Sequence, residues 1–172
     1  MKKVLIMVLV LSMLLSGCGT SRQVTTTSDY GDVQGKNTAV KGESLEYDGI
    51  KITLDSVENY VDTTEYPMDI PDEGKEYVVL RFTAENTGDE DVYLNMFNAE
   101  SYCDDVAISS DDFLINLEGE AIWGDIAPGK LRKGYVAYEA EADWSKIEFI
   151  YSPDILNDKV KMIFTAQKSD IE

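Results

Sequence analysis

Two pairs of adjacent aspartates are the residues of this chain best suited to bind a metal ion. Asp104-Asp105 and Asp111-Asp112 flank a short Val-Ala-Ile run. Carboxylate oxygens that converge from loops can bind Ca²⁺ with the weak affinity of extracellular modules. The spacing, however, lacks the Asp-x-Asp-x-Asp-Gly order of a calcium loop, and adjacent side chains on a strand point to opposite faces. The pattern therefore favours solvated turns and no cofactor, with a Ca²⁺ site at Asp104, Asp105, Asp111 and Asp112 as the alternative.

The chain contains no histidine, and this restricts the chemistry further. Ser-His-Asp catalysis, Cys-His catalysis and every His-ligated metal site are excluded. Paired carboxylates could hydrolyse a glycosidic bond, but among 33 acidic residues no pair is singled out by its position. We therefore expect no catalytic residue, and an envelope hydrolase is the disfavoured alternative.

Aromatic side chains offer a second kind of contact, because they can stack on a sugar or a peptide. Trp123 lies in a loop-like Ile-Trp-Gly segment and is, with Tyr93, the candidate for an exposed ligand contact. Tyr60 and Tyr66 are further members of such a platform. Trp144 stands just before an expected strand, a position typical of a ring that closes the end of a β-sandwich. Packing in or beside the core is the favoured interpretation of both tryptophans.

The N-terminus predicts the compartment. Lys2 and Lys3 precede an apolar run of 12 residues, which is shorter than the roughly 20 residues of a transmembrane helix but suits a secretory signal peptide. The run ends in Leu-Ser-Gly-Cys18, which resembles the bacterial lipobox. That resemblance implies a diacylglyceryl group on Cys18, cleavage before it, and a protein anchored at the outer face of the cell membrane. An ordinary secretory signal cut near Gly17 is the alternative.

Charge and cysteine content restrict the partners. The formal net charge of −18 argues against nucleic acid and against direct adsorption to anionic lipid, so membrane contact would be made through the lipid anchor. The same charge could favour cationic partners or divalent ions, although solvation of the fold is the simpler explanation. With Cys18 lipidated, Cys103 has no intrachain partner, and a disulfide framework is excluded. Cys103 is then best explained as a small buried hydrophobe, with a reactive thiol as the alternative.

The chain divides into three parts. Residues 1–17 form the expected signal peptide, and residues 18–42, rich in Thr, Ser and Gly, the lipidated cysteine and a flexible tether. Residues 43–172 alternate apolar and polar side chains, as half-buried strands do. Asn86-Thr87-Gly88-Asp89 predicts a hairpin turn, and Pro67 and Pro71 mark an irregular connection. The expected buried sets are Ile50, Ile52, Leu54; Val78, Leu80, Phe82, Ala84; Val136, Tyr138, Ala140; Ile147, Phe149, Tyr151; and Val160, Met162, Phe164.

These sets predict an all-β, antiparallel sandwich of about seven to nine strands, with a barrel as the alternative. Residues 76–94, which include Glu-Asn-Thr-Gly, and residues 126–139, in which a Pro-Gly turn leads to a Gly-Tyr strand, carry a family resemblance. The chain resembles the telokin-like, immunoglobulin-fold domains of unknown function on Gram-positive surface lipoproteins, which are similar in fold to an immunoprotective extracellular antigen of mycobacteria. The resemblance covers roughly residues 45–166. It implies an immunoglobulin-like sandwich and no catalytic residues, and the path over 98–112 departs from the family pattern.

These observations predict a membrane-anchored, extracytoplasmic and non-enzymatic module. Its expected partner is a protein or another envelope component, bound through loops or an open sheet edge, and not nucleic acid. The first alternative is a Ca²⁺-dependent or Ca²⁺-stabilised adhesion-type module, and the second is the envelope hydrolase. A pure binding module predicts an exposed apolar or aromatic patch.

Overall fold

The computed structural model describes residues 21–23, 37–111, 113–154, 156–157 and 159–172. The expected signal peptide and Cys18 lie outside these residues, as does Asp112. Within the described part, no helix has both the length and the apolar character needed to cross a membrane. The elements are β1 (Ser21–Gln23), β2 (Thr38–Val40), β3 (Ser44–Tyr47), β4 (Ile50–Tyr60), β5 (Lys75–Asn86), β6 (Val92–Leu94), the 3-10 turn η1 (Met96–Asn98), β7 (Ala99–Cys103), β8 (Val106–Ala107), β9 (Gly124–Ile126), β10 (Leu131–Glu141), β11 (Lys146–Tyr151), β12 (Met162–Gln167) and the 3-10 turn η2 (Lys168–Asp170).

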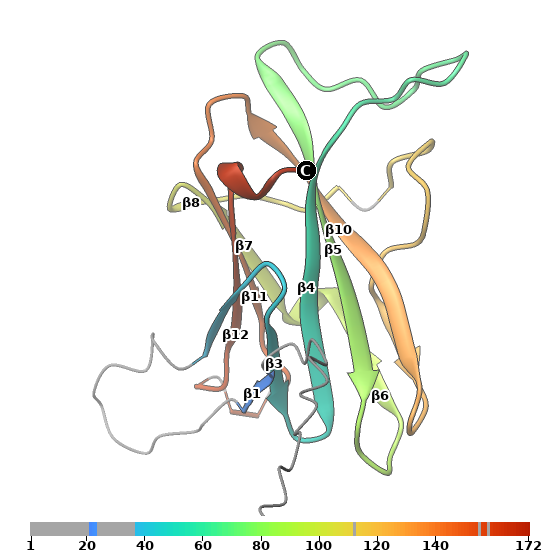
Figure 1. Cartoon of the computed structure of the whole chain (residues 1–172), viewed down its shortest axis with the longest axis vertical. Coiled ribbons are helices and arrows are strands. Elements are labelled where there is room, and N and C mark those ends of the chain that lie inside the picture. The colour runs from blue at the N-terminus through green and yellow to red at the C-terminus, as the bar shows by residue number, and fades with distance from the viewer. Residues whose placement is uncertain (1–20, 24–36, 112, 155, 158) are drawn as a thin grey trace, which may run out of the picture.

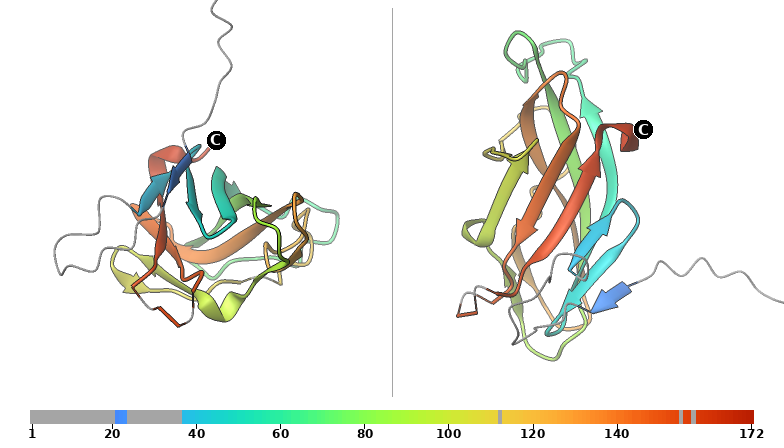
Figure 2. Two further views of the ribbon diagram at one scale, coloured as in Figure 1. Left: turned by 90° about the horizontal axis from the view of Figure 1, so that it is seen from below. Right: turned by 90° about the vertical axis from the view of Figure 1, so that its left-hand side faces the viewer.

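Two five-stranded sheets pack face to face (Figures 1 and 2). The first has the strand order β1-β3-β4-β5-β10 and the second β2-β12-β11-β7-β8, while β6 and β9 form a separate two-stranded ribbon. Pairing is antiparallel except at two edges, where β1 runs parallel to β3 and β2 parallel to β12. The predicted all-β sandwich is therefore confirmed. The described part has twelve strands, more than the predicted seven to nine. The prediction was too low because β1, β2, β6, β8 and β9 are two or three residues long, too short to show alternation in the sequence.

The main core lies between the two sheets, and the predicted alternating residues make up most of it. All sixteen of them are buried. Phe82 of the first sheet meets two rings of the second, with ring centroids 5.0 Å from Phe149 and 5.5 Å from Phe164. Period-two alternation therefore identified the inward faces of the long strands correctly.

A second, smaller core lies on the outer face of the first sheet. Val79 and Ala137 point away from the main core, where alternation predicts contact with water, yet both are fully buried. Leu114 and Leu117, from the connection between β8 and β9, cover them together with Tyr77 and Tyr135. A long loop thus converts part of the predicted wet face into a buried one.

The folded domain begins earlier than residue 43. β2 lies within the segment 18–42 that the sequence assigns to a tether, but it pairs with β12 over Thr38–Val40 and its Ala39 is fully buried. β1 also lies in that segment and pairs with Ser44–Glu46 of β3. These strands escape sequence analysis because three residues with few apolar side chains carry no readable period.

The hairpin predicted at Asn86–Asp89 does not form, because β5 pairs with β4 and β10 while β6 pairs with β9. Asn86 instead fixes a different turn. Its Oδ1 accepts from the Gly88 amide, and its Nδ2 donates to the carbonyls of Glu90 and Ile126. The buried side chain thereby turns the chain away from β5 toward the β6–β9 ribbon.

Trp144 closes one end of the sandwich, as its position predicts. It is 1% exposed, and its indole nitrogen donates to Glu76 Oε1 at 2.7 Å. Lys168 lies over the ring at 5.4 Å and also donates to Glu76. Burial would raise the pKa of Glu76, but the bonds from Lys168 and Trp144 hold it below its ordinary value.

Candidate functional site

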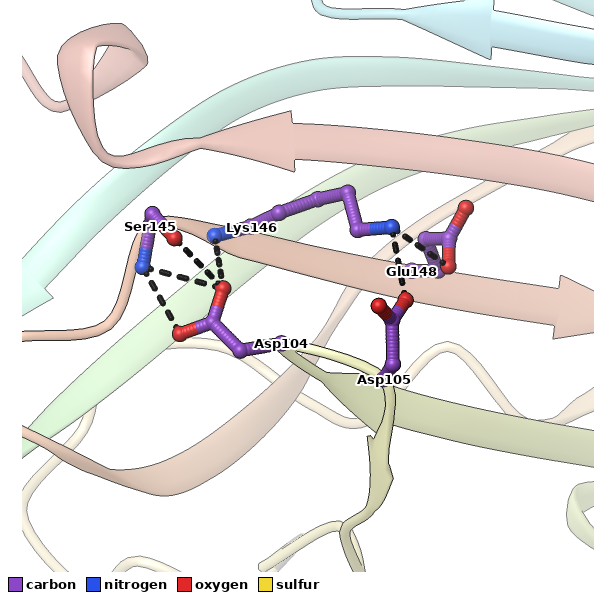
Figure 3. A network of polar contacts seen from close by, with 5 residues as sticks. All are labelled: Asp104, Asp105, Ser145, Lys146 and Glu148. Carbon is purple, nitrogen blue, oxygen red and sulfur yellow. Dashed lines mark hydrogen bonds and ion pairs between the residues drawn. The ribbon is translucent and has the colours of Figure 1, made fainter.

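Asp104 and Asp105, two of the four candidate metal ligands, occupy the tight turn between β7 and β8. Asp104 accepts hydrogen bonds from the Ser145 amide at 3.0 Å, the Ser145 hydroxyl at 2.6 Å and the Lys146 amide at 2.9 Å (Figure 3). These bonds, those from Ser145 foremost, lower the pKa of Asp104. Asp105 pairs with Lys146 Nζ at 3.0 Å, and the same ammonium pairs with Glu148. Both carboxylates therefore bind protein donors that connect the β7–β8 turn to β11.

Asp111 lies against a different strand. Its amide donates to the Ala137 carbonyl of β10, and its carboxylate accepts from the Phe113 amide. Asp112, the fourth candidate, lies outside the described residues. In the part of the chain that the structure describes, no three acidic or cysteine side chains gather in a metal-binding arrangement. The structure thus does not bring Asp111 together with Asp104 and Asp105.

Trp123 and Tyr93, the candidate ligand contacts, lie on different parts of the surface. Trp123 is half-buried and packs on the main core, with its ring centroid 6.1 Å from that of Phe149. It lines a concavity of about 460 Å³ beside β7, together with Met96 and Tyr102. Tyr93 is 58% exposed on β6. The structure therefore assigns Trp123 a packing role, and ligand contact by either residue stays a prediction.

Two loops meet at the end of the sandwich where β4 ends and β5 begins. We call them the distal loop pair: residues 61–74, between β4 and β5, and the described residues of 108–123, between β8 and β9. Asp62 and Asp69 of the first loop are buried, with exposed fractions of 9% and 6%. Buried carboxylates are rare unless their oxygens are paired. Here the pairing groups come from both loops.

Asp62 accepts five hydrogen bonds. Four come from its own loop, from the amides of Thr64, Met68 and Asp69 and from the Thr64 hydroxyl. The fifth comes from Nδ2 of Asn116 in the second loop at 2.7 Å. Burial alone would raise the pKa of Asp62, but these bonds hold it well below its ordinary range. Asp62 is therefore charged at neutral pH and fixes the shape of its loop.

Asp69 makes the second connection. Its two carboxylate oxygens accept from the amides of Ile115 and Asn116, each at 2.7 Å, and from the Tyr60 hydroxyl at 3.0 Å. Burial, and then the bond to Asp69, raises the pKa of Tyr60 to about 12. Because Leu114 and Leu117 are anchored in the second core on either side of Asn116, both loops are held in place.

Large apolar side chains nevertheless remain exposed on these fixed loops. In the first loop, Val61, Tyr66, Met68 and Ile70 are 64–76% exposed, and in the second Phe113 and Ile115 are 85% and 63% exposed. Single exposed apolar residues are ordinary, and others are exposed elsewhere on the domain, but these six are concentrated on two loops that hydrogen bonds join. The distal loop pair therefore carries exposed apolar and aromatic side chains of the kind that a binding module predicts.

β10 fixes the far end of the second loop by close backbone contact. The Ile122 amide donates to the Tyr135 carbonyl, and the Tyr135 amide donates to the Glu120 carbonyl. A Cβ on Gly134 would stand 2.6 Å from the Cα of Ile122, so only glycine lets the loop lie this close. Arg81 also contacts the loop through the Glu118 carbonyl, while its Nε bonds both oxygens of Glu58.

The sequence predicts only part of this site. Pro67 and Pro71 indicated an irregular connection and Tyr66 was named among the aromatic candidates, but Asp62, Asp69 and Asn116 carry no motif. Asn116 lies 54 residues after Asp62, and the topology alone brings them together. One local signal could have indicated the site: several large apolar residues lie within two loops that are otherwise rich in turn residues.

The fold places the chain in the class of all-β sandwich domains. Within that class the chain belongs to the DUF4352 family, a domain of unknown function, whose model matches residues 40–162. This confirms the expected membership among β-sandwich domains of unknown function, without supporting the telokin-like designation. Among curated proteins, no sequence matches this chain.

Solved structures share the fold at low sequence identity. The ycdA protein of Bacillus subtilis, a candidate lipoprotein, has a TM-score of 0.54 and 16% identity over 74% of this chain, which spans only 39% of that protein. The yjhA protein of the same organism has a TM-score of 0.52 and 17% identity over 73% of this chain and 96% of its own. The secreted protein MPT63 of Mycobacterium tuberculosis has a TM-score of 0.51 and 10% identity over 76% of this chain and 95% of its own. At these identities the likeness shows the fold.

Proposed function

We propose that this protein is a lipid-anchored, extracytoplasmic and non-enzymatic interaction module that binds a protein or another envelope component through the distal loop pair. The observation that carries this proposal is the exposure of six large apolar side chains on loops fixed by Asp62 and Asp69. Loops held in one conformation lose little entropy on binding, so their apolar side chains can contribute affinity.

The position of the loop pair agrees with attachment through Cys18. Ser21 of β1 is level with Ser44 and, through it, with Thr53 of β4. From Thr53 to the end of β4 at Tyr60 the strand rises roughly 20 Å. Cys18 is three residues from Ser21 and so within about 10 Å of it. Figures 1 and 2 show β1 toward the end of the sandwich opposite the distal loop pair. A lipid on Cys18 would therefore attach the chain nearer to β1 than to the distal loop pair.

The sequence and its relatives support the compartment. The signal-like residues 1–17 and the lipobox-like segment before Cys18 are those of an exported lipoprotein, and one structural neighbour is a candidate lipoprotein and another a secreted protein. Metabolic labelling with an alkynyl fatty acid should mark the wild-type chain and not Cys18→Ala. Labelling of Cys18→Ala would refute the anchor site.

Crosslinking in living cells tests the binding surface. A photoreactive benzoylphenylalanine in place of Phe113 probes the distal loop pair, and the same residue in place of Phe97 serves as the matched control. Both phenylalanines are nearly fully exposed, at 85% and 88%, but Phe97 lies in η1, at the other end of the sandwich. We expect discrete adducts from position 113 that position 97 does not give. Identical adducts from the two positions would contradict the proposal.

A further inference from the structure

The distal loop pair is strongly acidic as well as apolar. Residues 61–74 and 108–123 contain nine Asp or Glu residues and no Lys or Arg. Asp62 and Asp69 accept hydrogen bonds from within the loop pair. Asp72 pairs with Lys75, and Glu120 pairs with Arg132. The remaining described carboxylates are Glu65, Glu73, Asp111 and Glu118, which have no basic partner in the described part of the chain.

The cations that contact these loops are already neutralised. Lys75 lies 3.1 Å from Glu139 as well as 3.3 Å from Asp72. Arg81 donates to both oxygens of Glu58 at 2.8 and 2.9 Å. The apolar side chains therefore stand in a field of uncompensated negative charge, which selects partners by charge as well as by shape.

Resting on the function proposed above, we propose that the distal loop pair binds a cationic amphipathic segment, one that presents apolar side chains beside lysine or arginine. The apolar side chains of such a segment would cover those of Tyr66, Ile70 and Phe113, while its cations would meet Glu65, Glu73 and Glu118. A second copy of the chain would bring the same negative charges into contact, and an anionic lipid surface would be repelled for the same reason.

Defined peptides test this charge selectivity. The probes are a fluorescent amphipathic Leu/Lys peptide, the matched Leu/Glu peptide, and a Leu/Lys peptide of the same composition in a non-amphipathic order. The lipidated full chain is held in phosphatidylcholine nanodiscs, empty nanodiscs give the blank, and binding is read as fluorescence anisotropy at low and high salt. We expect the amphipathic Leu/Lys peptide to bind at least about tenfold more tightly than either other peptide, and more weakly at high salt.

Variants locate the contact. The double variant Ile70→Ser/Phe113→Ser should weaken binding of the amphipathic Leu/Lys peptide by about tenfold or more. Tyr66→Ser offers a second apolar change. The triple variant Glu65→Gln/Glu73→Gln/Glu118→Gln should weaken binding of this peptide by a similar factor and make that binding less dependent on salt. Two controls should change binding less than about twofold. They are Phe97→Ser and Asp89→Asn/Asp91→Asn, the latter in an acidic concavity of about 680 Å³ near the start of β4.

Several results would overturn this inference. Equal binding of the Leu/Lys and Leu/Glu peptides would exclude selection by charge. Equal binding of the amphipathic and the non-amphipathic Leu/Lys peptides would show only a general electrostatic attraction, without recognition of an apolar face. Loss of binding in Asp89→Asn/Asp91→Asn alone would place the contact at the opposite acidic concavity. If crosslinks from position 113 persist while the peptides fail, the interaction surface stands and only its cationic partner is refuted.

Discussion

Asn116 Nδ2 donates to Asp62 Oδ2 at 2.7 Å and so connects two loops whose bonded residues are 54 positions apart in the chain. Asp62 is buried and already holds four donors of its own loop. The bond from Asn116 therefore couples the folding of the second loop to an arrangement that the first loop makes by itself. It therefore helps to hold in place the two loops that carry the exposed apolar side chains.

Removing this connection should loosen the loop pair while leaving the sandwich folded. Asn116→Ala deletes the Nδ2 bonds to Asp62, Thr64 and the Tyr66 carbonyl. We expect the melting temperature to fall by about 3–6 °C and amide exchange to accelerate at Ile115 and its neighbours. Thr63→Ala, in the same loop at an exposed position, is the control. Unchanged exchange in Asn116→Ala would show that the loops hold together without this bond.

The Asp62 carboxylate should make stability depend on acid. Its pKa in the folded protein is held below the ordinary value, so its contribution is complete above the unfolded pKa near 4 and is lost as the pH falls toward the folded pKa. Asp62→Asn lacks this contribution at every pH. In urea unfolding, the difference in the free energy of unfolding between wild type and Asp62→Asn should therefore be constant from about pH 7 to pH 5. The difference should decrease from about pH 4 to pH 3. A difference of the same size at pH 3 would exclude Asp62 as the titrating group.

Gly134→Ala should separate the second loop from β10. The added methyl group would stand 2.6–2.8 Å from the backbone of Ile122 and Glu120. Because the neighbours are backbone atoms, we expect a loss of about 1–3 kcal/mol in the free energy of unfolding. Gly42→Ala is a useful comparison, since its methyl group meets nothing within 4 Å and tests only the positive φ of 83°. A neutral Gly134→Ala would mean that the loop can move aside at no cost.

Calcium should leave the fold unaffected. Asp104 already binds the Ser145 and Lys146 donors, and Asp105 binds the Lys146 ammonium. We expect no saturable change in melting temperature on addition of about 5 mM CaCl₂ and then EDTA, whereas a site at 100-fold saturation would add about 2.7 kcal/mol. A saturable shift with Ca²⁺ and not with Mg²⁺ would restore the Ca²⁺-stabilised module.

Local alternation was sufficient to predict the long strands, and tertiary contacts decided the rest. Val78, Leu80 and Phe82 are buried as their period requires. Val79, between them, is also buried, because a loop more than 30 residues later covers the outer face. No period within β5 carries that information.

The candidate site was less predictable because its determinants are single polar residues. Asp62 and Asp69 resemble any solvated acid of a turn until Asn116 and the amide of Ile115 are placed beside them. The predicted hairpin at Asn86 was wrong for a similar reason. Its side chain forms a long-range bond to the Ile126 carbonyl that the local sequence does not reveal.

The occupancy of the distal loop pair on the cell tests the central claim most directly. In a Cys103→Ser background, Phe113→Cys and Phe97→Cys are labelled with a membrane-impermeant maleimide, on intact cells and after solubilisation. We predict that the ratio of labelling at position 113 to that at position 97 is several-fold lower on cells, because a partner covers the loop pair. Shielding by the membrane would instead affect the end of the sandwich nearer β1, where position 97 lies, and would raise this ratio on cells. An equal ratio on cells and in solution would contradict the account.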